Sequence, residues 1–67
     1  MKYYEIVEEL HAVAEAGLPF WVITKSGKRL YCNYVDGDIM ASELPKDPYK
    51  VSAEELLHKA QYLLPCY

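Results

Sequence analysis

The sequence predicts a small two-layer α+β domain, in which two helices cover one face of a three-stranded antiparallel meander. Residues 3–16 and 52–64 each have apolar side chains at helical spacing. Between them, residues 20–42 form an aromatic-rich run that is cut twice by turn signals, at Ser26-Gly27 and at Asp36-Gly37. These observations give the order α-β-β-β-α within a single domain that spans residues 1–67.

The first segment predicts an amphipathic helix that ends at Gly17. Glycine accepts the left-handed conformation common just past a helix, and Pro19 disfavours helix at Leu18. The apolar side expected to face the core consists of Tyr3, Ile6, Val7, Leu10, Val13 and Ala14.

The three strands are expected to pair through two tight hairpins. A two-residue loop at Ser26-Gly27 sets Ile23 opposite Leu30 and Trp21 opposite Cys32. The loop at Asp36-Gly37 sets Tyr34 opposite Ile39, Cys32 opposite Ala41, Asn33 opposite Met40 and Tyr31 opposite Ser42. The face predicted to be buried carries Trp21, Ile23, Leu30, Cys32, Tyr34, Ile39 and Ala41, and the open face carries Phe20, Val22, Thr24, Arg29, Tyr31, Asn33, Met40 and Ser42.

The two prolines of residues 44–49 predict a loop, because each removes a backbone donor and biases the preceding residue away from helix. Ser52 followed by Glu55 fits a capping box, and Val51 with Leu56 fits the adjoining hydrophobic staple. The second helix is expected to continue to Pro65. Its apolar stripe consists of Ala53, Leu56, Leu57, Ala60, Leu63 and Leu64.

Composition limits the classes of function. A chain of 67 residues has little room for an enclosed active-site cleft, so a non-enzymatic protein without a cofactor is expected. Ten acidic against seven basic residues give a net charge of −3, which disfavours general binding to nucleic acid. Neither a membrane span nor a signal peptide is evident, which predicts a cytoplasmic protein.

The cysteines and histidines do not form a recognisable motif. Cys32 and Cys66 are too far apart to suggest a disulfide framework, and we expect two free thiols with Cys32 buried. His11 and His58 complete the ligand types for one zinc ion, but none of the four residues is paired at the short spacing of zinc sites. No metal site is therefore predicted, and Cys32, which points into an apolar face, is not expected to be a nucleophile.

The candidate binding site is the open face of the sheet. Aromatic residues, Met and Arg are enriched at protein interfaces, and this face combines them. The predicted partner-binding residues are Phe20, Val22, Arg29, Tyr31, Asn33 and Met40. Among the tyrosines, Tyr3 and Tyr34 are expected in the core, and Tyr4, Tyr49, Tyr62 and Tyr67 at the boundary or surface, where tyrosine suits protein contacts.

Two charged surfaces offer alternatives. An acidic band on the first helix, Glu5, Glu8, Glu9 and Glu15, has the charge of a nucleic-acid mimic, although a solvated helix face is the simpler interpretation. Lys25, Lys28 and Arg29 flank the first hairpin and predict a weak nucleic-acid site. The element order is similar to that of the double-stranded RNA-binding domain, but residues 52–55 read Ser-Ala-Glu-Glu where that family has a lysine cluster.

The sequence thus favours a cytoplasmic protein-interaction module that binds and inhibits or modulates a larger host or regulatory macromolecule by steric occlusion. Its overall character, compact, acidic and rich in tyrosine, resembles small inhibitors carried by phages and mobile elements. The alternatives are a nucleic-acid-binding regulator that uses Lys25, Lys28 and Arg29, and a homodimer that pairs its open faces. Exposed strand edges at residues 20–25 and 38–43 would invite strand addition by a partner.

Overall fold

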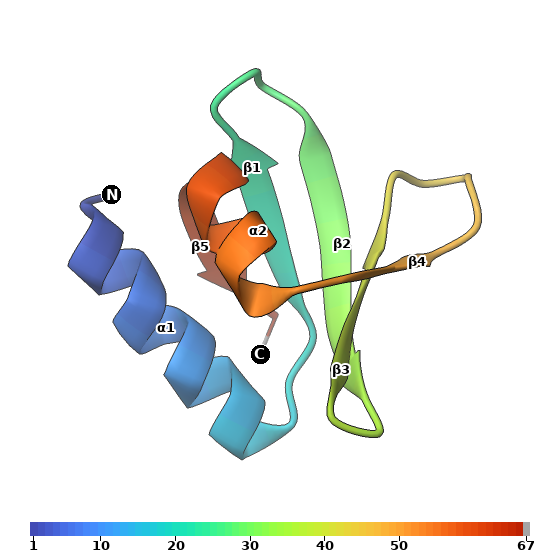
Figure 1. The fold of residues 1–67 in the computed structure, drawn as a ribbon, viewed down its shortest axis with the longest axis horizontal. Helices are drawn as coiled ribbons and strands as arrows, with labels where there is room; N and C mark the ends of the chain where they lie inside the picture. Colours follow the sequence, from blue (N-terminus) through green and yellow to red (C-terminus); the bar gives the residue numbers. More distant parts are fainter. Residues whose placement is uncertain (67) are drawn as a thin grey trace.

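The computed structural model describes residues 1–66 of the chain. It is an α+β fold in which both helices pack on one face of an antiparallel sheet (Figure 1). The predicted class and meander are confirmed, but the sheet has five strands in the order β4-β3-β2-β1-β5. The elements are α1 (Tyr3–Ala16), β1 (Phe20–Thr24), β2 (Arg29–Val35), β3 (Asp38–Ser42), β4 (Tyr49–Val51), α2 (Ala53–Lys59) and β5 (Ala60–Pro65).

Helix α1 has the predicted bounds. Gly17 follows it with φ of 66°, and the N–H of Leu18 donates to the carbonyl of Val13, which satisfies the helix end in a Schellman motif. At the other end, the Glu5 carboxylate accepts from the Lys2 N–H at 3.1 Å. Ile6, Leu10 and Val13 are buried, whereas Tyr3, which was expected in the core, is 61% exposed.

The β2–β3 hairpin has the predicted register at all four expected pairs. Asp36 and Gly37 both have positive φ, 52° and 86°, as the two central residues of a type I′ turn require. This turn matches the right-handed twist of the strands. Cys32, Ile39 and Ala41 therefore lie in the core, as expected.

The predicted register of β1 is wrong by one residue. Trp21 lies opposite Tyr31 and Val22 opposite Leu30, because the loop has three residues, Lys25–Gly27, rather than two. Gly27 has φ of 89° and donates its N–H to Thr24 O, and the Thr24 hydroxyl accepts from the Lys28 N–H. A one-residue shift turns every β1 side chain to the other face. The core face of β1 is therefore Phe20, Val22 and Thr24, and the open face carries Trp21 and Ile23.

Helix α2 begins as predicted but is shorter than expected. The Ser52 hydroxyl accepts from the Glu55 N–H at 3.1 Å, and Val51 and Leu56 are both buried. The helix ends at Lys59, and Ala60–Pro65 pairs with β1 as strand β5. This strand replaces the C-terminal half of the expected helix, so the element order also departs from that of the double-stranded RNA-binding domain.

A bulge in β5 explains why this strand resembles a helix in sequence. Thr24 pairs with Ala60 but Ile23 pairs with Tyr62, so Gln61 is an extra residue. Strand alternation is displaced by one position, and Leu56, Ala60 and Leu63 are buried at spacings of four and three residues. Those spacings are also the ones of an amphipathic helix.

Both strand edges whose exposure would invite strand addition, at residues 20–25 and 38–43, lie inside the sheet. Strand β5 covers β1, and β4, at the end of the predicted loop, covers β3. The N-terminus lies along the outer edge of β5, where the Met1 ammonium donates to Gln61 O and the Met1 sulfur accepts from the Leu63 N–H. Pro65 carries no N–H at that edge, and a strand without free donors is poorly suited to strand addition.

Candidate functional site

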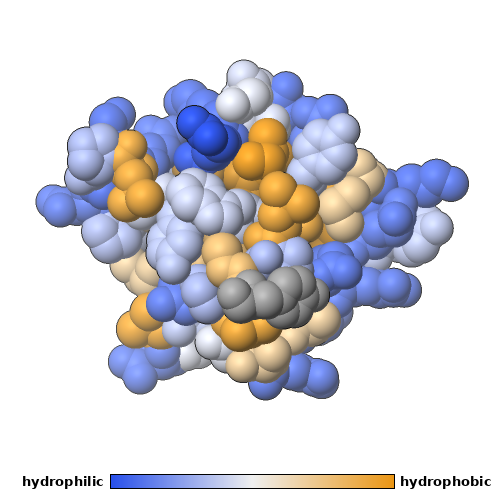
Figure 2. All heavy atoms as spheres, turned by 180° about the vertical axis from the view of Figure 1, so that it is seen from behind, coloured by the Kyte–Doolittle hydropathy of each residue, from blue (hydrophilic) through white to orange (hydrophobic). Residues whose placement is uncertain are grey.

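The open face of the sheet is the side that the two helices leave uncovered. Figure 2 views the molecule from this side and shows hydrophobic side chains gathered near its centre. Every strand contributes to this face. Its apolar and aromatic members are Trp21, Ile23, Tyr31, Val35, Met40, Tyr62 and Leu64.

Trp21 lies at the middle of a ladder of cross-strand neighbours, between Tyr31 of β2 and Leu64 of β5. Its indole packs edge-on against Tyr31 of β2, with ring centroids 5.1 Å apart and an interplanar angle of 64°. On the other side of the strand its register partner is Leu64, which is 50% exposed. Ile23 is in turn paired with Tyr62, which is 43% exposed. The aromatic rings are thus held by neighbours on both sides while part of their surface remains open.

The segment between β3 and β4 makes one border of this face into a groove. The Lys46 N–H donates to Glu43 O at 2.9 Å, and the buried Ser42 hydroxyl donates to Lys46 O at 2.8 Å. These bonds fix the turn beside the sheet. The resulting groove has a volume of about 660 Å³ and lies between Tyr31 and Met40 on the sheet and Leu44, Pro45 and Pro48 on the loop.

Charged groups lie at the rim of the apolar surface. Lys50 and Asp38 form an ion pair at 3.5 Å. Arg29 is exposed beside Ile23 and has no carboxylate within ion-pair distance among residues 1–66. An apolar centre with a polar, partly cationic rim is the arrangement seen in protein–protein interfaces.

The structure corrects the predicted binding set. Phe20 and Val22 are fully buried, at 0% exposure, and belong to the core beneath the helices. Arg29, Tyr31, Asn33 and Met40 do lie on the open face, as predicted.

The prediction missed the contribution of β1 and β5 to this face, which is Trp21, Ile23, Tyr62 and Leu64. One local signal in the sequence indicates that Trp21 and Ile23 face the open side. Serine is a poor first residue for a type I′ turn, whereas Lys25-Ser26-Gly27 has glycine at the third position, where a three-residue loop requires it.

Lys25, Lys28 and Arg29, which were predicted to bind nucleic acid, do not all lie on the same side of the sheet. Arg29 lies on the open face, whereas Lys25 and Lys28 lie on the side of the helices. Lys28 is paired with Glu43 at 3.4 Å, and Lys46 approaches the other oxygen of the same carboxylate at 3.6 Å. The three predicted residues therefore do not form one surface.

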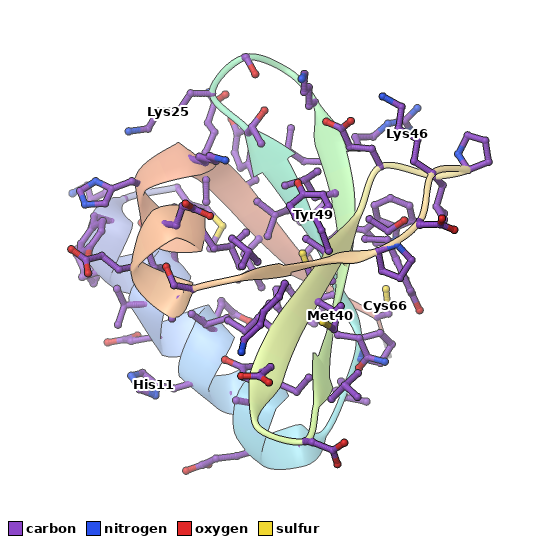
Figure 3. The ribbon with its side chains drawn as sticks, turned by 45° about the vertical axis from the view of Figure 1, so that its right-hand side comes forward. His11, Lys25, Met40, Lys46, Tyr49 and Cys66 are labelled. Atoms are coloured by element: carbon purple, nitrogen blue, oxygen red, sulfur yellow. The ribbon has the colours of Figure 1, made fainter. Side chains whose placement is uncertain are left out.

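The acidic residues of α1 have different surroundings. Glu8 and Glu15 are exposed, whereas Glu5 and Glu9 lie at the boundary with the core, and Glu5 caps the helix. An exposed acidic helix face is thus present, but it consists of few residues. His11 also projects from α1 into solvent (Figure 3).

Cys32 is buried against the core, and its burial raises the pKa of the thiol to about 12. Cys66 is half-buried, and neither cysteine is in a disulfide. Across the 66 residues that the structure describes, no three His, Cys, Asp or Glu side chains gather to hold a metal ion. Tyr67, expected at the boundary or surface, lies outside the described residues.

No helix among residues 1–66 has the length and apolar character needed to cross a membrane. No protein-family model matches the chain, and no curated protein or solved structure is significantly similar to it.

Proposed function

We propose that this protein is a small non-enzymatic interaction module, which binds a larger protein through the open sheet face and inhibits or modulates it by steric occlusion. The observation that supports this function most strongly is the ladder centred on Trp21. Tryptophan and tyrosine dominate the binding energy of many interfaces, because they bury large areas with few rotatable bonds. Here they are packed in place before any partner arrives.

The dimensions of the face suit a protein partner. The molecule measures 29 × 27 × 22 Å, and Figure 2 looks along its shortest axis onto the open side. A face bounded by the two longer dimensions is comparable to the roughly 800 Å² that each partner contributes to a standard interface. A protein docked there would cover the sheet from Leu64 to the groove at Met40.

The charges at the rim favour a partner different from this chain. Arg29 has no acidic partner within the described residues, and Asp38 on the same face is already paired with Lys50. A partner with an apolar patch bordered by a carboxylate would complement Arg29. We therefore favour binding to another protein over pairing of two open faces.

The test compares two double variants that make the same change of charge at similarly exposed side chains. Tyr62→Glu with Leu64→Glu alters the open face, where the residues are 43% and 50% exposed. Tyr3→Glu with Tyr4→Glu alters α1, where they are 61% and 59% exposed. A partner captured from nuclease-treated native extract, identified and purified, is then titrated with each variant by calorimetry.

We expect a stoichiometric complex with the unmodified chain and with the α1 variant, and at least about a hundredfold weaker binding by the open-face variant, because buried unpaired carboxylates are costly. Competition with the partner's own substrate or ligand tests occlusion. Equal binding by both variants would place the interface elsewhere. Dimeric mass of the unmodified chain and monomeric mass of the open-face variant in sedimentation would show that the face pairs with itself.

A further inference from the structure

A second concave surface lies on the helix side of the sheet, under the tip of the β1–β2 hairpin. It has a volume of about 430 Å³, within the usual range of small-ligand sites. Its lining comes from the hairpin tip and the adjoining start of β2, from Glu43 after β3, from Tyr49 of β4 and from the C-terminal end of α2. In Figure 3, Lys25 projects from the tip on the side of α2, and Tyr49 lies in the same half of the molecule.

This cleft gathers positive charge in a chain whose net charge is −3. Lys25, Lys28 and Lys59 line it, together with His58. The lining carboxylate is Glu43, which is within 4 Å of two lysines, Lys28 at 3.4 Å and Lys46 at 3.6 Å. Lys25 and Lys59 have no carboxylate within that distance among residues 1–66. The cleft therefore has an excess of ammonium groups that no side chain neutralises.

Backbone hydrogen bonds fix the segments from which the lysine side chains project. The Lys25 N–H donates to Lys59 O at 2.9 Å, which ties the hairpin tip to the end of α2. The Thr24 N–H bonds to Lys28 O at 2.8 Å, and the Thr24 and Ser26 hydroxyls are 2.9 Å apart. Two of the positively charged side chains thus project from residues that are joined by a backbone hydrogen bond, so their backbone positions are fixed relative to each other before a ligand binds.

The cleft also has an apolar part. Its walls include the buried Leu30 and the ring of Tyr49, which is 42% exposed. Lysines supply point charges for a phosphate, hydroxyls supply hydrogen bonds, and an exposed ring supplies a surface for stacking a planar group. We propose that this cleft binds a phosphomonoester that also carries a planar ring, a ligand of the size and chemistry of a nucleoside monophosphate, in which a ribose joins the phosphate to the base.

The site is independent of the proposed open-face interface, because it lies on the opposite side of the sheet. The test is a heteronuclear NMR titration of the full chain with adenosine monophosphate, with adenosine and inorganic phosphate as separate probes. We expect saturable shifts at the amides of residues 24–28, Tyr49 and Lys59 with the monophosphate. Binding should weaken as salt is raised, and adenosine alone should bind at least about tenfold more weakly.

Two matched variants test the lysines. Lys25→Gln with Lys59→Gln removes the two unneutralised charges and should weaken binding of the monophosphate about tenfold or more, as expected for loss of charge-assisted hydrogen bonds. Lys2→Gln with Lys50→Gln removes the same net charge elsewhere and should change the affinity less than about twofold. Tyr49→Leu should weaken the monophosphate but not inorganic phosphate.

Several results would overturn the proposal. Shifts that do not saturate, or that centre on the open face, would exclude a site in the cleft. Adenosine that binds as tightly as the monophosphate would exclude phosphate recognition. An equal loss in the two lysine variants would show only a general charge effect. The titration of the unmodified chain decides the first two questions without depending on how any variant folds.

Discussion

Adjacent aromatic residues have opposite roles in this chain. Phe20 is fully buried under the helices, with its ring 6.1 Å from that of Tyr34, whereas the next side chain, Trp21, crosses to the open face and packs on Tyr31. The alternation of a strand imposes this difference. One aromatic residue therefore serves stability, and the other is available for binding.

Truncation of the two rings should separate these roles. Phe20→Ala is expected to lower the free energy of unfolding by about 3–5 kcal/mol, which is comparable to the whole stability of so small a domain. Trp21→Ala should cost less than half as much, because its indole is already partly solvated in the folded state. Urea titrations followed by circular dichroism measure both. The reverse order would mean that β1 has the register originally predicted.

Cys32 should make stability depend on alkaline pH. Burial raises the pKa of its thiol from 9.0 to about 12, so above pH 9 the unfolded chain releases a proton that the folded chain retains. Stability is therefore complete below pH 9 and falls as pH rises toward 12.

Between pH 9 and pH 10 the expected loss from this thiol is about 1 kcal/mol. Burial also raises the pKa of Tyr34, which acts in the same direction at higher pH. Urea unfolding at a series of pH values tests this, with Cys32→Ala as the control. The variant starts from lower stability but should show a shallower decline, and parallel declines would contradict the assignment.

At the scale of elements, the two hairpins show how the residues of a turn determine the register of the strands that it joins. Asp36 and Gly37 adopt the conformation that their types favour, and the predicted β2–β3 register is confirmed. The loop at Lys25–Gly27 uses a single glycine at its third position, and the resulting shift moves Phe20 and Val22 into the core. The length of this loop determined which side chains of β1 face the core.

Strand β5 is the element whose structure differs most from the one that its sequence pattern predicts. Leu63 and Leu64 both belong to the apolar stripe of the expected helix, but in the structure Leu63 is 2% exposed and Leu64 is 50% exposed. The bulge at Gln61 produces the misleading spacing.

These two leucines provide a matched test of β5. Leu63→Ala should destabilise the fold by about 2–5 kcal/mol, because it leaves a cavity in the core. Leu64→Ala should change stability by no more than about 0.5 kcal/mol, as is usual for exposed positions. Thermal and urea denaturation of both variants measure the difference. Similar large losses for both would favour the helical alternative for residues 60–65.

At the scale of the whole molecule, the sheet separates two chemically different surfaces. One side presents the aromatic ladder around Trp21 with Arg29 at its rim. The other side presents the acidic outer face of α1 and the lysine-lined cleft, which lies beside the C-terminal end of α2. The sheet and its core lie between them, so a partner could occupy the open face while the cleft remains accessible.

The two proposed sites should therefore respond independently to substitution. Tyr62→Glu with Leu64→Glu is expected to abolish protein binding and leave the monophosphate shifts within about twofold of the original affinity. Lys25→Gln with Lys59→Gln should do the opposite. Measuring both ligands on both variants completes the test. If either variant weakens both ligands, the sites are coupled or the fold is altered.

The sequence by itself determined the elements whose signals are local. The spacing of Ile6, Leu10 and Val13 with Gly17 specified α1, Asp36-Gly37 specified one hairpin, and Ser52 began α2. Tertiary structure alone decided the change from helix to strand at Ala60 and the pairing of β4. In each case a backbone segment with two permissible conformations adopted the one whose hydrogen bonds and buried side chains a distant strand could complete.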